Sequence, residues 1–126
     1  MNLLFIDQMR RLSANMNHSN YLPEFEKDFN RLLKRYRSLN EDIKIFEDFI
    51  FQNPTGLGKN FTIMHSSENV KIVKARMMCR FLRGRSIRII YAYHHNNFEF
   101  MYIEVYFKGD KENEDRERIE EYLKGL

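Results

Sequence analysis

The sequence concentrates its positive charge in one short run. Residues 71–88 contain seven lysines and arginines and no acidic residue. Within residues 73–81, apolar residues alternate with Lys74, Arg76 and Arg80. Alternation with a period of two places the two sets on opposite faces of a β-strand. One face can then enter a core, while the other presents a row of cations suited to a polyanion.

The composition is typical of one globular domain. The 126-residue chain is long enough for a single core, and its eleven Phe and seven Tyr are unlike the composition of a disordered chain. Its only cysteine, Cys79, excludes an internal disulfide and a cysteine-based zinc site, which suits a reducing cytosol. Since no apolar run approaches the length of a membrane span, we expect a soluble, cytoplasmic protein.

Two helices are expected before the basic run. Apolar residues recur at three- and four-residue steps over residues 22–36, where Pro23 fits the first helical turn. Ser38 and Glu41 have the spacing of a capping box, and a second apolar stripe follows over residues 39–50. The short connection between the two segments predicts an antiparallel helical hairpin.

The second half of the chain is expected to form an antiparallel sheet and a last helix. β-branched and aromatic runs at residues 61–65, 70–82, 87–94 and 98–107 predict strands with short connections. In the last strand we expect Met101, Ile103, Val105 and Phe107 to face the helices, and Phe98, Phe100, Tyr102, Glu104 and Tyr106 to lie on the other face.

Residues 113–125 are expected to form the last helix, with Asn113 as its cap and Gly125 at its end. Glu112 with Arg116, and Glu114 with Arg118, are spaced for ion pairs along this helix. We expect residues 1–20 to be an N-terminal extension and residues 21–126 to form one α+β domain. This domain has a helical hairpin packed on an antiparallel sheet of three to four strands, with a short C-terminal helix.

Several segments resemble a known family. They are Glu-Phe-Glu-Lys-Asp-Phe at residues 24–29, Val-Lys-Ala-Arg at 73–76, Ile-Arg-Ile-Ile-Tyr at 87–91 and Tyr-Phe-Lys-Gly-Asp-Lys-Glu at 106–112. Together with the order of elements, they resemble the RelE/ParE superfamily of bacterial toxins over roughly residues 21–124. The resemblance implies the toxin of a type II toxin-antitoxin system. It also implies a ribosome-dependent messenger RNA endoribonuclease, silenced by an antitoxin that covers the basic face.

The resemblance also implies which residues act. Lys74 and Arg76 look like the basic strand residues of the cleaving members, and Arg88 looks like the arginine that opens the next strand. The basic residue after the last strand is Lys108 or Lys111. The resemblance implies the ribosome, its mRNA and a cognate antitoxin as partners, with no membrane, metal or other cofactor.

The chemistry of RNA cleavage suggests roles for these residues. RNA carries its own nucleophile, the 2′-hydroxyl, so a metal-free enzyme must supply a proton acceptor, a proton donor and cations near the phosphorus. Arg76 and Arg88 would clamp the scissile phosphate. Lys74 would add a positive charge or, with its pKa lowered by neighbouring cations, accept the proton. Glu104 is the other candidate acceptor.

Donors and RNA contacts complete the expected site. Lys111 or Tyr106 would protonate the leaving oxygen, and Tyr102 would offer a ring on which an unstacked base can lie. The remaining expected RNA contacts are cations, namely Lys71, Arg80, Arg83, Arg85 and Lys108.

Two other functions fit the same sequence. A ParE-like toxin would inhibit DNA gyrase without cleaving RNA. A binding module would hold RNA or an acidic protein segment on the same basic face without chemistry. All three interpretations need the cations to lie together.

Overall fold

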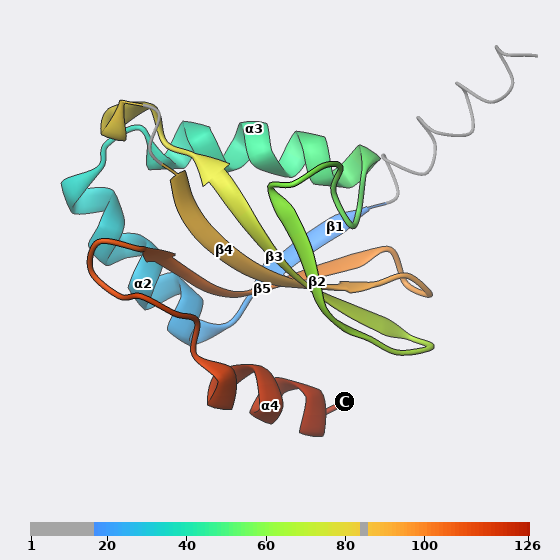
Figure 1. Cartoon of the computed structure of the whole chain (residues 1–126). Helices are drawn as coiled ribbons and strands as arrows, with labels where there is room; N and C mark the ends of the chain where they lie inside the picture. Colours follow the sequence, from blue (N-terminus) through green and yellow to red (C-terminus); the bar gives the residue numbers. More distant parts are fainter. Residues whose placement is uncertain (1–16, 84–85) are drawn as a thin grey trace, which may run out of the picture.

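The computed structural model describes residues 17–83 and 86–126, which form an α+β fold (Figure 1). The elements in chain order are β1 (His18–Tyr21), α2 (Pro23–Arg35), α3 (Leu39–Gln52), β2 (Phe61–Ser66), β3 (Val70–Met78), a short 3-10 helix (Arg80–Leu82), β4 (Ser86–His94), β5 (Glu99–Phe107) and α4 (Arg116–Lys124). The expected order of two helices, a sheet and a short last helix is confirmed.

Five strands form a single sheet in the order β1-β5-β4-β3-β2. The pairs β2–β3, β3–β4 and β4–β5 are antiparallel, while β1 runs parallel to β5 with His18 opposite Glu99. The expected three to four strands were therefore too few. Strand β1 comes largely from the segment that we assigned to an N-terminal extension, where the polar residues show no strand pattern. The rest of that segment, residues 1–16, lies outside the described residues.

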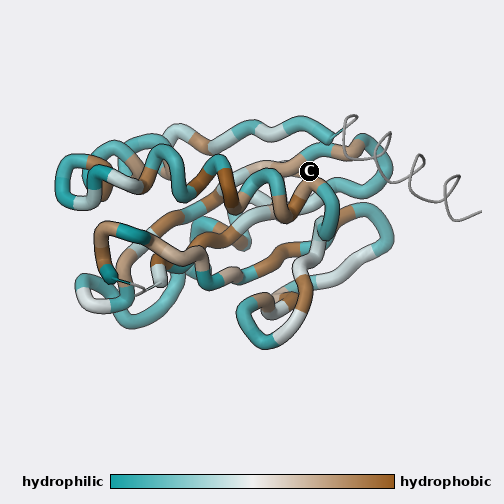
Figure 2. The backbone as a smooth tube through the Cα atoms, turned by 90° about the horizontal axis from the view of Figure 1, so that it is seen from above, coloured by the Kyte–Doolittle hydropathy of each residue, from teal (hydrophilic) through white to brown (hydrophobic). Residues whose placement is uncertain are grey.

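Helices α2 and α3 cover one face of the sheet (Figure 1). Phe25 and Leu32 of α2 and Phe46 and Ile50 of α3 are buried against the strands, as the helical periodicity predicted. Seen from above, the hydrophobic stretches of the chain lie in the strands and helices, and the connecting loops are mostly hydrophilic (Figure 2). The main core therefore lies between the sheet and this helical layer.

The expected capping box at the start of α3 does not form. Ser38 occupies the cap position but makes no side-chain cap hydrogen bond. Its hydroxyl instead donates to Asp42 at 2.7 Å and accepts from the backbone N–H of Phe81 at 2.9 Å. The Ser38 side chain therefore fixes the turn after β3 to α3. This turn also ends β3 at Met78, before the end of the strand expected over residues 70–82.

Helix α4 lies on the other face of the sheet and covers only part of it (Figure 1). Its Ile119 packs against Ile72 of β3, Ile90 of β4 and Ile103 of β5. Asn113 does not cap this helix. The cap is Asp115, whose side chain accepts from the backbone N–H of Arg118 at 3.1 Å.

The ion pairs expected along α4 are replaced by contacts with other elements. Glu114 pairs with Lys74, and with Arg116 at 3.5 Å. Arg118 pairs with Asp28 of α2. The expected end of the helix at Gly125 is confirmed.

A bulge in β5 changes which residues face the helices. Ile90 pairs with Glu104 and Tyr91 with Tyr102, so Ile103 is an extra residue in β5. Tyr102 therefore enters the core under α2 and α3, as does Phe100. Ile103, like Met101, packs on the α4 side. The strict alternation expected for this strand was wrong before the bulge and right at Val105, Tyr106 and Phe107.

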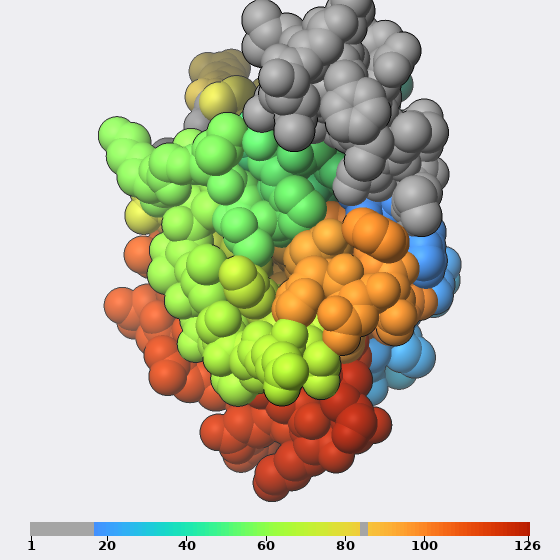
Figure 3. Space-filling view, turned by 90° about the vertical axis from the view of Figure 1, so that its right-hand side faces the viewer, coloured from blue at the N-terminus to red at the C-terminus, as the bar shows by residue number. Residues whose placement is uncertain are grey.

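One end of the molecule is formed by two hairpins. The β2–β3 hairpin and the β4–β5 hairpin lie side by side next to α4 (Figure 3). Asn96 donates to Asn69 Oδ1 at 2.7 Å across their tips. Among the described residues, no helix has the length and apolar character needed to cross a membrane.

Candidate nucleic-acid interface

Two arginines lie directly opposite each other on neighbouring strands. Arg76 of β3 pairs in register with Arg88 of β4, which pairs with Tyr106 of β5, so the three residues form a row across the sheet. Burial and the charge of Arg76 both lower the pKa of Arg88, yet an arginine stays charged in proteins. Because like charges placed opposite each other destabilise a sheet, the row favours binding of an anion.

Neither guanidinium is neutralised by a carboxylate from the described part of the chain. Within residues 17–83 and 86–126, Arg88 donates to the hydroxyl and the carbonyl oxygen of Ser86, which lies on the same strand. None of the ion pairs among the residues that the structure describes includes Arg76 or Arg88. Both groups therefore keep their full charge for a ligand.

The arginines line a groove of about 430 Å³, which we call the basic groove. The groove occupies the part of the α4-bearing face of the sheet that α4 leaves uncovered. Every second residue of β3 points to this face, so Lys74 and Arg76 lie on the same side of the strand as Ile72, which packs in the cluster under α4. Six of its lining residues are basic and only one is acidic. The lining consists of Lys59, Asn60, Thr62, Met64, Lys74, Arg76, Arg88, Lys108, Glu114 and Arg116.

Lys74 is held by the acidic residue of the groove. Its ammonium donates to Glu114 at 2.9 Å, and the Glu114 side chain is only 5% exposed. Burial lowers the pKa of Lys74, but the hydrogen bond to Glu114, the charge of Glu114 and the interaction with Tyr106 outweigh burial and leave that pKa raised. The expectation that neighbouring cations lower this pKa was wrong. Lys74 therefore stays protonated and supplies positive charge.

Tyr106 interacts with Lys74 and pairs in register with Arg88, but it is not one of the residues that line the basic groove. Its hydroxyl is buried and has no hydrogen-bond partner among the described residues. Burial raises the pKa of Tyr106, and the opposing charge of Lys74 does not cancel this effect. The phenol therefore keeps its proton near neutral pH, and its expected role as a proton donor stays a prediction.

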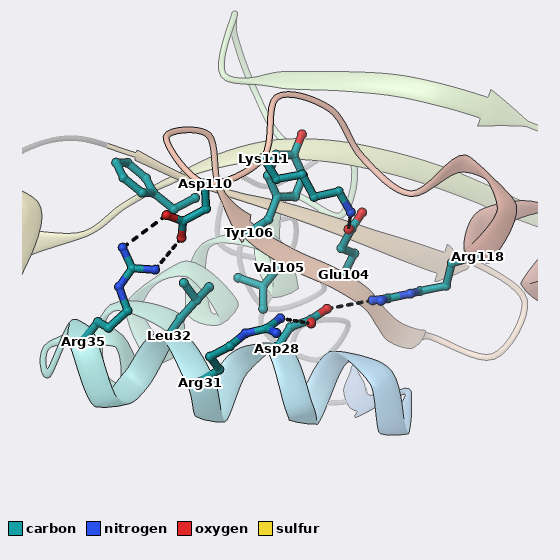
Figure 4. A pocket seen from close by; sticks show the side chains of 11 residues that line it. Asp28, Arg31, Leu32, Arg35, Glu104, Val105, Tyr106, Asp110, Lys111 and Arg118 are labelled. Atoms are coloured by element: carbon teal, nitrogen blue, oxygen red, sulfur yellow. Dashed lines mark hydrogen bonds and ion pairs between the residues drawn. The ribbon is translucent and has the colours of Figure 1, made fainter.

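Glu104 and Lys111 lie in a different cavity. Glu104 is 1% exposed, and its carboxylate accepts from the Lys111 ammonium and from the backbone N–H of Asp115 at 2.8 Å. Both residues line a cavity of about 370 Å³ between α2, β5 and the loop that follows β5 (Figure 4). Because they neutralise each other outside the basic groove, neither fits its expected role as base or acid.

The same cavity contains other paired charges, so we call it the paired cavity. Arg118 pairs with Asp28 at 2.9 Å, and Arg35 pairs with Asp110 across the mouth (Figure 4). The cavity is lined by Asp28, Arg31, Leu32, Arg35, Glu104, Val105, Tyr106, Phe107, Asp110, Lys111 and Arg118.

Two other expected RNA contacts are cations that point elsewhere. Lys71 alternates with Ile72, so it lies on the opposite face of β3 from Lys74. Arg80 pairs with Glu41 at 3.0 Å and with Asp42 at 3.1 Å, which ties it to α3.

The remaining expected contacts have mixed outcomes. Tyr102 is 3% exposed, stacks on Phe25 and donates to Glu47 at 2.9 Å, so its expected role as a platform for a base is wrong. Arg83 follows the 3-10 helix at a positive φ of 53° and does not line the basic groove. Arg85 lies outside the described residues. Lys108 does line the groove.

Sequence reasoning missed three charged residues of the groove, namely Lys59, Glu114 and Arg116. Lys59 belongs to the loop before β2, where the carbonyl of Asn60 accepts from the N–H of Arg76 at 2.9 Å. Glu114 and Arg116 reach the groove through the loop after β5. No pattern in the sequence predicts that these two loops lie next to the basic strands. Among the described residues, no group of three His, Cys, Asp or Glu side chains could hold a metal ion.

The fold and the groove define an α+β protein with a basic face on an antiparallel sheet. No family model matches the sequence, and no curated protein matches it. A chain of the crystal structure of the archaeal RelE-RelB complex from Pyrococcus horikoshii OT3 matches the fold with a TM-score of 0.57 at 14% sequence identity. The match covers 75% of this chain and 97% of that chain. The protein therefore has a RelE-like fold, as the sequence segments predicted.

Proposed function

We propose that the protein is the toxin of a type II toxin-antitoxin system and cleaves messenger RNA on the ribosome. The observation that carries this proposal is the pair of Arg76 and Arg88, which lie opposite each other in a basic groove and pair with no carboxylate of the described residues. Such a pair matches the two non-bridging oxygens of a phosphodiester. The likeness of the fold to a protein crystallised with RelB supports the same function.

The residues of the groove and the neighbouring Tyr106 divide the work of cleavage. Arg76 and Arg88 hold the scissile phosphate and stabilise the charge that develops on it as the 2′-oxygen attacks. Lys74, which stays protonated, adds a positive charge on one side of this phosphate. Lys108 binds a neighbouring phosphate. Tyr106 is the candidate donor to the leaving 5′-oxygen because its phenol keeps its proton.

The proposal implies three partners. The mRNA is held by its phosphates, because the described residues that line the groove include six cations and no aromatic ring. The ribosome must then present the strand, which places the protein in the cytoplasm. A cognate antitoxin would silence the toxin by covering the basic groove with acidic side chains.

The test compares variants after brief induction in a bacterial host, with growth recorded and the 5′ ends of messages mapped. We expect the wild type to arrest growth and to leave cut messages. Arg76→Ala or Arg88→Ala should lower cleavage by about 10²–10³-fold, as loss of a transition-state contact does. Arg31→Ala is the matched control, because Arg31 is exposed on α2 outside the groove.

Three results would contradict the proposal. Arrest that persists in both groove variants would exclude the groove as the active site. Inhibition of DNA supercoiling with intact messages would favour the gyrase-directed toxin. Intact messages in cells that keep growing would favour the interpretation of the protein as a binding module without catalytic activity.

A further inference from the structure

We propose that Glu114 is the general base of the cleavage and accepts the proton of the attacking 2′-hydroxyl. This inference rests on the function proposed above and assigns the one role that the expected residues leave open. Glu114 is the only carboxylate that lines the basic groove among the described residues. It lies on the loop between β5 and α4, among the cations that would hold the phosphate.

The other candidate acceptors do not fit this role. Lys74 is protonated because Glu114 holds it. Glu104 lines the paired cavity and does not line the basic groove, so it does not reach a phosphate held by Arg76 and Arg88. Tyr106 keeps its own proton because burial raises its pKa. A carboxylate that faces the same groove as Arg76 is the remaining acceptor.

The ionisation of Glu114 suits a base that is activated by its substrate. Burial raises the pKa of Glu114, but the hydrogen bonds from Lys74 and from backbone and the charges of Lys74 and Arg116 outweigh burial and lower it. The carboxylate is therefore ionised before RNA binds. A phosphate bound by Arg76 and Arg88 brings negative charge into the groove, which raises the proton affinity of this carboxylate when the acceptor is needed.

The fold holds Glu114 in place from both sides. The next residue, Asp115, donates its backbone N–H to Glu104 and caps α4 through its side chain. The Glu114 carboxylate itself is fixed by Lys74 at 2.9 Å. Because the base is anchored through a buried carboxylate and a helix cap, little reorganisation is needed before proton transfer.

The chemical step balances without a further reagent. The proton of the 2′-hydroxyl passes to Glu114 as the 2′-oxygen forms a bond to phosphorus, and the bond from phosphorus to the 5′-oxygen breaks. The leaving oxygen takes the proton of the Tyr106 phenol, the donor proposed above. The Tyr106 phenolate regains a proton from water, and the hydroxide so formed takes the proton from Glu114, which restores both groups. The products are a 2′,3′-cyclic phosphate and a 5′-hydroxyl end.

The test measures single-turnover cleavage of mRNA on programmed ribosomes at saturating protein. Glu114→Gln keeps an oxygen that can accept from Lys74 but removes the base, so the cleavage rate should fall by about 10²–10⁴-fold. Binding of an RNA oligonucleotide with a 2′-deoxy residue at the cleavage site should stay equal or become tighter, because a negative charge leaves the groove. Glu112→Gln is the matched control, with the same change two residues away on the exposed loop.

A pH profile separates a base from a residue that only positions Lys74. The wild-type rate should depend little on pH near neutrality, because a carboxylate with a lowered pKa is already ionised there. Glu114→His should restore part of the rate and make it rise with pH around the ordinary histidine pKa of about 6.5. This second variant also keeps the test valid if the glutamine variant folds poorly, which circular dichroism would reveal.

Two results would overturn the inference, and a third would overturn the function beneath it. A glutamine variant that cleaves as fast as the wild type excludes a base at this position. A variant with weaker binding but an unchanged rate at saturation has lost only the positioning of Lys74. If the wild type itself cuts no message on ribosomes, the proposed function fails and the role of Glu114 fails with it.

Discussion

The basic groove and the paired cavity contain similar residues in opposite arrangements. Both are lined by several cations beside β5, and their volumes are similar at about 430 and 370 Å³. In the paired cavity, Arg118, Arg35 and Lys111 each contact a carboxylate (Figure 4). In the basic groove, Arg76 and Arg88 contact none among the described residues. Charges that are already neutralised serve the fold, whereas charges left without a counterion are available to a ligand.

The largest difference between the two regions is expected when one arginine in each is replaced by alanine and the free energy of unfolding is compared. Arg118 is 18% exposed in its side chain, and it donates to Asp28 and to the carbonyl of Ile103 at 3.0 Å. Arg118→Ala leaves both acceptors without this partner, so we expect a loss of about 2–3 kcal/mol in the free energy of unfolding. Arg76→Ala removes like-charge repulsion and should change that free energy by less than about 0.5 kcal/mol.

Urea unfolding of the two variants and the wild type measures this difference. The RNA-cleavage assay should give the reverse order. Arg76→Ala should lower the cleavage rate by the factor given above, and Arg118→Ala should change the rate per folded molecule little. An Arg76 variant that is destabilised as much as the Arg118 variant would show that the groove arginine supports the fold, and the distinction between the two regions would fail.

The groove arginines could be predicted from the sequence because they lie on regular strands. Alternation in β3 placed Lys74 and Arg76 on one face, and short connections made Arg88 a neighbour on the next strand. These features depend only on local periodicity and on antiparallel pairing. The helices of the hairpin followed from the spacing of residues such as Phe25 and Phe46 for the same reason.

Most failures of prediction involve irregular backbone or contacts between distant segments. Lys71 is an exception, because the alternation of β3 itself places it on the face opposite Lys74. The bulge at Ile103 moved Tyr102 into the core, and a single extra residue of this kind leaves no signal in a run of apolar residues. The roles of Glu104 and Glu114 depend on the path of the loop after β5, which returns over the sheet. Charged residues in a loop carry no periodicity, so their partners could not be derived from spacing.

A smaller effect is expected at the rim of the groove. Lys108 is exposed and lines the groove, so it should contact a phosphate without reaching the scissile bond. Lys108→Ala should weaken binding of single-stranded RNA by less than about tenfold and reduce the slope of log affinity against log salt by about 1. Fluorescence titrations over a range of salt concentrations measure both. Lys124→Ala, on the exposed side of α4, should change neither.

The smallest effect concerns the pH dependence of the Lys74–Glu114 pair. The folded-state pKa of Glu114 is lowered, so its contribution to stability is complete above the ordinary pKa of 4.5 and is lost as the pH falls through the lowered value. The pKa of Lys74 is raised, so its contribution is complete below 10.5 and is lost only at higher pH. The difference in unfolding free energy between the wild type and Glu114→Gln should therefore stay constant between about pH 6 and pH 8, and should shrink in acid.

Urea unfolding at several pH values tests this expectation. A difference that changes near neutral pH would mean that the pair titrates there, and that Lys74 could lose its proton after all. If the difference is constant, the charge of the groove is fixed under physiological conditions. Salt, and an acidic partner that competes with RNA for Arg76 and Arg88, would then control access to the groove, and proton concentration would not.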